Sequence, residues 1–253
     1  PPTVCYDEST TTELDTSTGV VTCIGTGTGF ACEQPTQGKQ TICGQLHDLE
    51  TGMPFTDGNA TCAPCAATTA TGVCSLGLRA LDAIKFAQNP QDPGAILATE
   101  QIVLDDCGRF KIPNITLPTN PFVGIAIDDA APGMAGPLGT TNAIGMATPA
   151  VANQALKNFE AFVAPKSTTD AWDVDGPPVS GGSFVAIFRA MRDGQANQAG
   201  VTILEGPSPI SDNDFYFAGA ARTAIDPVAT STSANGTALV TNAALEGYIG
   251  AGG

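Results

Sequence analysis

The sequence PFVGIAID, residues 121–128, decides the fold class, because it is a nearly continuous apolar run bounded by turn residues. A short run rich in Val and Ile is typical of a strand that is buried on both faces. We therefore expect residues 121–128 to form a central strand of a sheet. Alternating segments earlier in the chain, ICGQLHDL at 42–49 and GRFKI at 108–112, predict further strands, and Val73 to Leu81 predicts another. Asp82 to Gln88 predicts one helical turn with Asp82 as its cap.

The composition is that of a globular protein and excludes several classes of partner. The chain has 253 residues, of which 42% are hydrophobic, and a net charge of -15 from 10 Lys and Arg against 25 Asp and Glu. Binding to nucleic acid needs clustered cations, which are too few here to form a patch, so we expect no nucleic-acid partner. Anionic membrane surfaces are disfavoured for the same reason. Abundant Gly, Pro and Thr favour strands and turns.

Features of the sequence also predict where the protein is found. The sequence starts with Pro1-Pro2 instead of Met, which is the pattern expected after removal of a signal peptide. The uncharged stretch 130–156 is interrupted by Pro132, Pro137 and Pro149, so we expect no membrane span. These features predict a protein that is secreted or displayed on the cell surface.

The cysteines are even in number and all lie before residue 108. They are Cys5, Cys23, Cys32, Cys43, Cys62, Cys65, Cys74 and Cys107. This density without a Cys/His finger pattern predicts four structural disulfides and an oxidising compartment, although the pairing cannot be read from the sequence. The only CxxC motif, Cys62-Ala63-Pro64-Cys65, leaves a redox pair or a metal site as alternatives.

The order of strand and turn signals predicts a mainly β chain of two sandwich units. The expected segments are an N-terminal arm rich in Thr and Gly (1–41), a disulfide-rich β-sandwich (42–130), a connector (131–183) and a second β-sandwich (184–253). Thr148-Pro149 followed by apolar residues at helical spacing predicts one α-helix in the connector, residues 149–163. Trp172, the only Trp, is expected to pack in a core.

Two sequence patterns carry a resemblance to a known family. The first unit contains GQLHDLETGMP at 44–54 and GRFKI at 108–112, and the second contains GVTI at 200–203 and NGTAL at 235–239. The chain resembles the carboxypeptidase-regulatory-like, or transthyretin-like (prealbumin-like), β-sandwich modules of secreted bacterial surface proteins. The resemblance implies seven-stranded Greek-key sandwiches, which usually serve as accessory, adhesive or structural domains without an active site. The insertion between residues 55 and 100 departs from the compact module.

Candidate sites for imidazole and metal chemistry are few. His47 is the only histidine, so sites that need two imidazoles are excluded. We expect His47 to be solvated at a strand end, with a role as ligand or base as the alternative. The calcium candidates are Asp173 and Asp175 in DVDG and Asp212 and Asp214 in SDND, where the alternative is an ordinary Asx turn. No other cofactor is expected.

Adjacent carboxylates occur at Asp105-Asp106 and Asp128-Asp129. Because neighbouring residues of a strand point to opposite faces, neither pair forms a catalytic dyad by itself, and we interpret them as solubilising edges or turns. The sequence therefore predicts a secreted, non-catalytic structural or cell-surface protein, which includes the repeating subunit of an extracellular filament. The alternatives are a glycan- or protein-binding adhesion module and a carboxylate-based hydrolase. Self-association is expected through residues 1–30 or the C-terminal tail.

Overall fold

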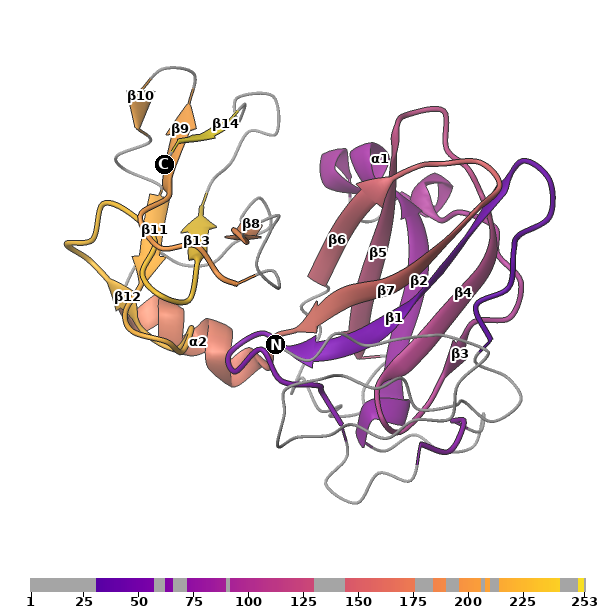
Figure 1. Cartoon of the computed structure of the whole chain (residues 1–253), viewed down its shortest axis with the longest axis horizontal. Coiled ribbons are helices and arrows are strands. Elements are labelled where there is room, and N and C mark those ends of the chain that lie inside the picture. The colour runs from indigo at the N-terminus through magenta and orange to yellow at the C-terminus, as the bar shows by residue number, and fades with distance from the viewer. Residues whose placement is uncertain are drawn as a thin grey trace. The chain divides into compact units, whose positions relative to one another are not determined.

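The computed structural model describes residues 31–56, 62–65, 72–89, 92–129, 144–175, 184–189, 196–205, 208–209, 214–241 and 250–252. The chain divides into two compact units, both mainly β (Figure 1). The amino-terminal unit contains Pro2–Asp48 and Gly52–Ala164, and the carboxy-terminal unit contains Pro165–Gly253 together with the turn Leu49–Thr51.

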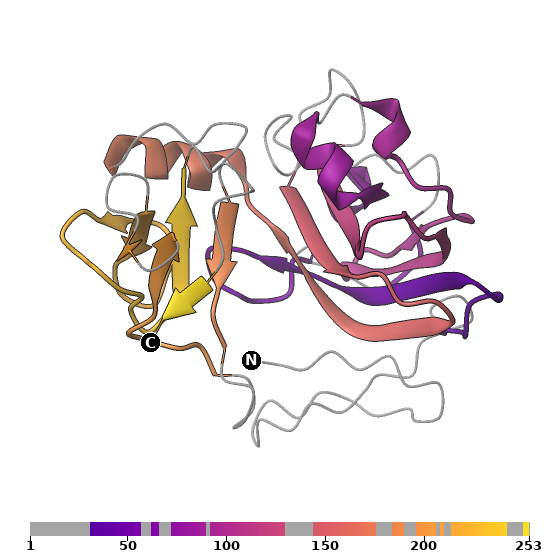
Figure 2. The same cartoon turned by 90° about the horizontal axis from the view of Figure 1, so that it is seen from above.

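The described strands of the amino-terminal unit form two sheets. The four-stranded sheet has the order β3 (Val103–Leu104), β4 (Arg109–Thr116), β1 (Lys39–Asp48) and β7 (Gln154–Val163). The three-stranded sheet has the order β2 (Leu76–Asp82), β5 (Phe122–Asp129) and β6 (Ile144–Pro149). β1 is antiparallel to β4 and parallel to β7, and Figure 2 shows β1 in indigo beside β7 in salmon. The central position of β5 confirms the prediction from residues 121–128.

One hydrophobic core is shared by the two sheets of this unit. Alternate residues of each strand point into it, as the period of a strand requires. Its fully buried members include Ile42 and Leu46 of β1, Phe110 and Ile112 of β4, and Val123, Ile125 and Ile127 of β5. Because the core draws on strands far apart in the sequence, the two sheets stabilise each other.

Short helices connect the strands of this unit. The 3-10 helix η1 (Gly72–Ser75) precedes β2, so the strand predicted from residue 73 starts at Leu76. α1 (Ala83–Gln88) follows β2, and Oδ1 of Asp82 accepts a hydrogen bond from the backbone N of Lys85 at 3.0 Å. This contact confirms Asp82 as the N-cap of the predicted helical turn. A second 3-10 helix, η2, covers Pro93–Ala95.

The predicted helix at 149–163 is wrong, because this stretch contains the end of β6 and all of β7. The pairing register with β1 shifts between Ile42–Leu156 and Gly44–Phe159, and Asn158 has a positive φ of 59°. This β-bulge brings Leu156 and Phe159, three residues apart, against the same core. The bulge therefore produces the apolar spacing that imitates a helix. The connector helix is α2 (Lys166–Asp175), which starts directly after Pro165.

The carboxy-terminal unit consists of α2 and two further sheets in the described residues. One sheet has the order β12 (Ile225–Asp226), β11 (Asp214–Phe217), β13 (Thr237–Val240) and β8 (Phe184–Ile187). The other has the order β10 (Ser208–Pro209), β9 (Thr202–Glu205) and β14 (Gly250–Gly252). Trp172 of α2 is buried, with its ring centroid 5.1 Å from that of Phe217 and its Nε1 donating to Arg222 O at 2.6 Å. This confirms the expected core position of Trp172.

The two terminal segments differ in what the structure describes. Gly250–Gly252 pairs with β9 of the same chain, whereas residues 1–30, proposed for self-association, lie outside the described residues. The part of the predicted arm that is described, from residue 31, leads into β1 at Lys39. Among the described residues, no helix has the length and hydrophobicity needed to cross a bilayer.

Candidate functional site

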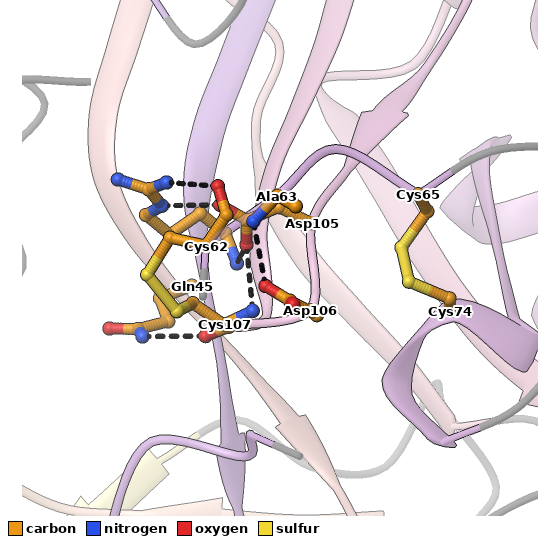
Figure 3. Close-up of polar contacts among 9 residues, drawn as sticks. Gln45, Cys62, Ala63, Cys65, Cys74, Asp105, Asp106 and Cys107 are labelled. Atoms are coloured by element: carbon orange, nitrogen blue, oxygen red, sulfur yellow. Dashed lines mark hydrogen bonds and ion pairs between the residues drawn. A yellow bond between two sulfur atoms is a disulfide. The ribbon is translucent and has the colours of Figure 1, made fainter. Parts of the chain in front are cut away.

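Six of the eight cysteines form three disulfides, all in the amino-terminal unit. The pairs are Cys32–Cys43, Cys62–Cys107 and Cys65–Cys74. Cys5 and Cys23 lie outside the described residues. The two cysteines of the CxxC motif bond to different partners (Figure 3), so the alternative of a redox pair within this motif is wrong.

A polar cluster surrounds two of these disulfides. We call it the cysteine-braced turn and define it as residues 62–65 and 105–109. Asp106 N donates to Ala63 O at 3.1 Å, and Ala63 N donates to Oδ1 of Asp106 at 2.9 Å (Figure 3). Cys65 N donates to Leu104 O at 2.8 Å. Residues 62–65 are therefore held along the turn between β3 and β4 by backbone bonds in addition to the disulfide.

Gly108 closes this turn in a conformation that glycine adopts most easily. Its φ is +75°, and a Cβ at this position would lie 2.4 Å from Phe55 O. Both the left-handed backbone and the close approach of Phe55 exclude a side chain. The geometry of the turn thus explains the glycine that ends the Asp-Asp-Cys-Gly sequence before β4.

A buried ion pair lies at the centre of the cysteine-braced turn. Asp105 is fully buried, and its Oδ1 accepts from the backbone N of Cys107 at 3.1 Å and of Arg109 at 2.8 Å. Its Oδ2 accepts from Nε of Arg109, and Nη2 of Arg109 donates to Cys62 O at 3.2 Å. Burial raises the pKa of Asp105, and the charge and hydrogen bonds of Arg109 oppose this effect.

The interpretation of Asp105-Asp106 as a solubilising edge or a turn is correct for the turn, to which both residues belong, but Asp105 is buried and therefore not solubilising. Asp105 is a buried ion-pair partner, and Asp106 accepts a bond from the CxxC segment. Sequence reasoning missed that the pair is buried, because the segment that starts at Cys62 is held against Arg109 by the Cys62–Cys107 disulfide and by the hydrogen bond to Cys62 O, across a long separation in sequence. The one signal in the sequence that pointed to this site was the turn motif Asp105-Asp106-Cys107-Gly108. Asp128 and Asp129 are the last two residues of β5.

Gln45 connects the cysteine-braced turn to the middle of the four-stranded sheet. Its Nε2 donates to Cys107 O at 2.9 Å. In the strand register Gln45 lies between Arg109 of β4 and Glu160 of β7, so these three side chains share one face of the sheet. That face is opposite to the one that carries Leu46 and Phe110 in the core.

His47 is buried and only 1% exposed, so the expectation of a solvated strand end is wrong. The chain turns back after β1, where Asp48 N donates to Met53 O and Gly52 N donates to Asp48 O, both at 2.8 Å. This turn places Gly52 O 3.1 Å from Nδ1 of His47. The ring centroid of Phe162, its neighbour on β7, lies 6.0 Å away.

The structure describes the calcium candidates only in part. Asp173 and Asp175 belong to α2 instead of a loop, and Asp212 lies outside the described residues. Oδ2 of Asp214 accepts from the Tyr216 hydroxyl at 3.0 Å, and this hydroxyl accepts from Ile203 N at 3.0 Å. Burial raises the pKa of Tyr216 to about 12. Within the described ranges, no three His, Cys, Asp or Glu side chains form a group that could hold a metal ion.

A second buried arginine organises the carboxy-terminal unit and was not anticipated. Nε of Arg222 donates to Oγ1 of Thr237 at 2.6 Å, and Nη1 donates to Leu49 O at 2.8 Å. Arg222 N also donates to Glu50 O at 3.3 Å. These bonds explain why the turn Leu49–Thr51 groups with this unit.

Comparisons with known proteins identify no relative. No protein-family model, no curated protein and no solved structure matches the chain. The contacts of the cysteine-braced turn are therefore the main indication of function. The polar side chains there bind backbone groups or each other, which is an arrangement suited to holding loops in place.

Proposed function

We propose that this chain is a secreted, non-catalytic structural or cell-surface protein. The observation that carries the proposal is the use of polar side chains in the cysteine-braced turn. Asp105, Asp106, Arg109 and Gln45 all make hydrogen bonds that connect chain segments. Charged groups used in this way stabilise a loop and leave little freedom for the proton transfers of an active site.

The location outside the cell is supported by the cross-links. Three disulfides lie within the amino-terminal unit, and disulfides persist mainly in oxidising compartments. In a chain-entropy view, closing the 45-residue separation between Cys62 and Cys107 stabilises the fold by about 4 kcal/mol. Such bracing suits a protein that must stay folded without cellular chaperones.

We extend the proposal to the fold, as a Greek-key sandwich of the transthyretin-like type. The seven strands β1–β7 in two sheets around one core support it for the amino-terminal unit. The chain also passes repeatedly between the sheets, since β1 and β2 lie in different sheets, as do β4 and β5. In the family that the chain resembles, modules of this type usually act as accessory, adhesive or structural domains.

We propose more specifically that copies of this chain assemble into a filament. Residues 1–30 are rich in Thr and Gly and poor in large apolar side chains, so they cannot form a core alone. Addition of such a segment as a strand to a sheet edge of another copy would propagate head to tail. This step rests on composition.

The test is to image and size the native protein and a variant without residues 1–30. We expect large particles or filaments for the full chain in negative-stain microscopy and in sedimentation velocity, and monomers for the variant. A full chain that stays monomeric at high concentration would contradict the filament. Recovery of the native protein only from the cell interior would contradict the structural, extracellular role. A selective hit on a glycan array by the monomer would favour the adhesion module instead.

A further inference from the structure

The three disulfides fall into two classes by exposure: Cys32–Cys43 is buried, whereas the four cysteines of Cys62–Cys107 and Cys65–Cys74 are all partly exposed. Cys32 and Cys43 are 2% and 0% exposed. Cys62 and Cys107, by contrast, are both partly exposed, and Ala63 and Pro64 beside Cys62 are exposed. A disulfide is reduced by a thiolate that attacks one sulfur along the S–S axis, so access to the sulfur controls the rate. The Cys62–Cys107 bond is therefore the more accessible of these two pairs.

The backbone at Cys62 gives a second reason for this bond to open. Cys62 has a φ of +57°, the left-handed region that is unfavourable for a residue with a Cβ. Its neighbours hold it there, through the bond to Cys107 and the hydrogen bond from Nη2 of Arg109 to Cys62 O. Once the disulfide opens, one of these restraints is lost and Cys62 can relax.

We expect opening to remain local, because side chains of both sheets pack the core next to this bond and still hold it when the loop-closure stabilisation is lost. Phe110 follows the turn in the sequence, and Leu46 lies beside the turn on the neighbouring strand β1. Both side chains are fully buried among residues of both sheets. The bonds that would still hold residues 62–65 are the two hydrogen bonds between Ala63 and Asp106, the bond from Cys65 N to Leu104 O, and the bond from Nη2 of Arg109 to Cys62 O. The cysteine-braced turn can thus take two arrangements on an unchanged sandwich.

We propose that Cys62–Cys107 is a redox-responsive disulfide that a dithiol partner opens in the folded protein. One thiolate of the partner attacks a sulfur of the pair, forms a mixed disulfide and releases the other cysteine as a thiolate. The second thiol of the partner then displaces the first cysteine. The partner is oxidised to a disulfide, and its two protons finish on Cys62 and Cys107. The opened turn frees the CxxC segment from Cys107.

The first experiment treats the folded full chain with a low concentration of dithiothreitol. At intervals the thiols are alkylated and each cysteine is quantified by peptide mass spectrometry, while far-UV circular dichroism monitors the fold. We expect Cys62 and Cys107 to be labelled at least about tenfold faster than Cys32 and Cys43, with the dichroism unchanged. Equal rates for the two pairs, or opening of Cys62–Cys107 only with loss of the dichroism signal, would overturn the proposal.

The second experiment removes one hydrogen bond from the turn. Asp106→Ala deletes the acceptor of Ala63 N, whereas Asp106→Asn keeps an oxygen at that position. Because Asp106 is partly exposed, we expect both variants to fold. Asp106→Ala should open Cys62–Cys107 about threefold faster without changing Cys32–Cys43, and Asp106→Asn should behave like the native protein. An unchanged rate in Asp106→Ala would show that the turn does not control the bond.

Discussion

Asp105 and Arg109 form an ion pair across the turn between β3 and β4, and the carboxylate is fully buried. The pair is more than a charge contact, because the same carboxylate accepts two backbone bonds and the same guanidinium donates to Cys62 O. A buried ion pair that loses one partner leaves an uncompensated charge, which is strongly destabilising. Even a conservative substitution of Asp105 or Arg109 is therefore expected to destabilise this turn.

The ion pair gives the first prediction. Asp105→Ala leaves Arg109 buried without its carboxylate and is expected to lower the free energy of unfolding by about 3–5 kcal/mol. Urea denaturation of the amino-terminal unit measures the loss. Asp92→Ala, which removes an exposed acceptor of Gly94 N in the same unit, is the control and should change stability by less than about 1 kcal/mol. Equal effects of the two substitutions would contradict the structural role of Asp105.

Gly44 gives a second prediction about the parallel pair of strands. A Cβ at Gly44 would lie 1.9 Å from Phe159 O of the neighbouring strand and 2.9 Å from Cζ of Phe110. Gly44→Ala should therefore force β1 and β7 apart and destabilise the unit by about 3 kcal/mol or more. Thermal unfolding measures the effect.

The matched control for this substitution is Gly38→Ala. Gly38 has a φ of +81°, but no atom lies within 4 Å of the position that a Cβ would take there. Only the backbone strain then applies, which costs about 1–2 kcal/mol. If Gly38→Ala were the more damaging change, the close contact of β1 with β7 would be wrong.

Tyr216 gives a pH-dependent prediction. Its pKa of about 12 lies above the ordinary 10.0, so the folded state holds the phenol proton more tightly than the unfolded state. The stability that this group contributes is fully present below pH 10 and is lost as the pH rises through 12. Titration of phenolate absorbance should show one of the three tyrosines ionising near pH 12.

Tyr216→Phe provides the control for this titration. It should remove the late transition, and it should also destabilise the carboxy-terminal unit by about 1–3 kcal/mol because Ile203 N loses its acceptor. A late transition that persists in Tyr216→Phe would assign the raised pKa to another tyrosine.

Local patterns predicted the strands better than they predicted the site. The apolar run 121–128 and the cap Asp82 needed no distant partner to be recognised, and both were confirmed. The helix at 149–163 failed because its spacing comes from a bulge, which only pairing with β1 reveals. The burial of Asp105 and His47 depends on how turns fold back over them, and short sequence windows do not contain that information.

The central claim, an extracellular structural protein braced by disulfides, is tested most directly by the thiol state of the native protein. The protein is isolated under alkylation without reduction, digested, and its cysteines are assigned by mass spectrometry. We predict four disulfides and no free thiol, and that three of the four are Cys32–Cys43, Cys62–Cys107 and Cys65–Cys74. Recovery of all eight cysteines as free thiols, or of Cys32 and Cys43 unpaired, would contradict the account.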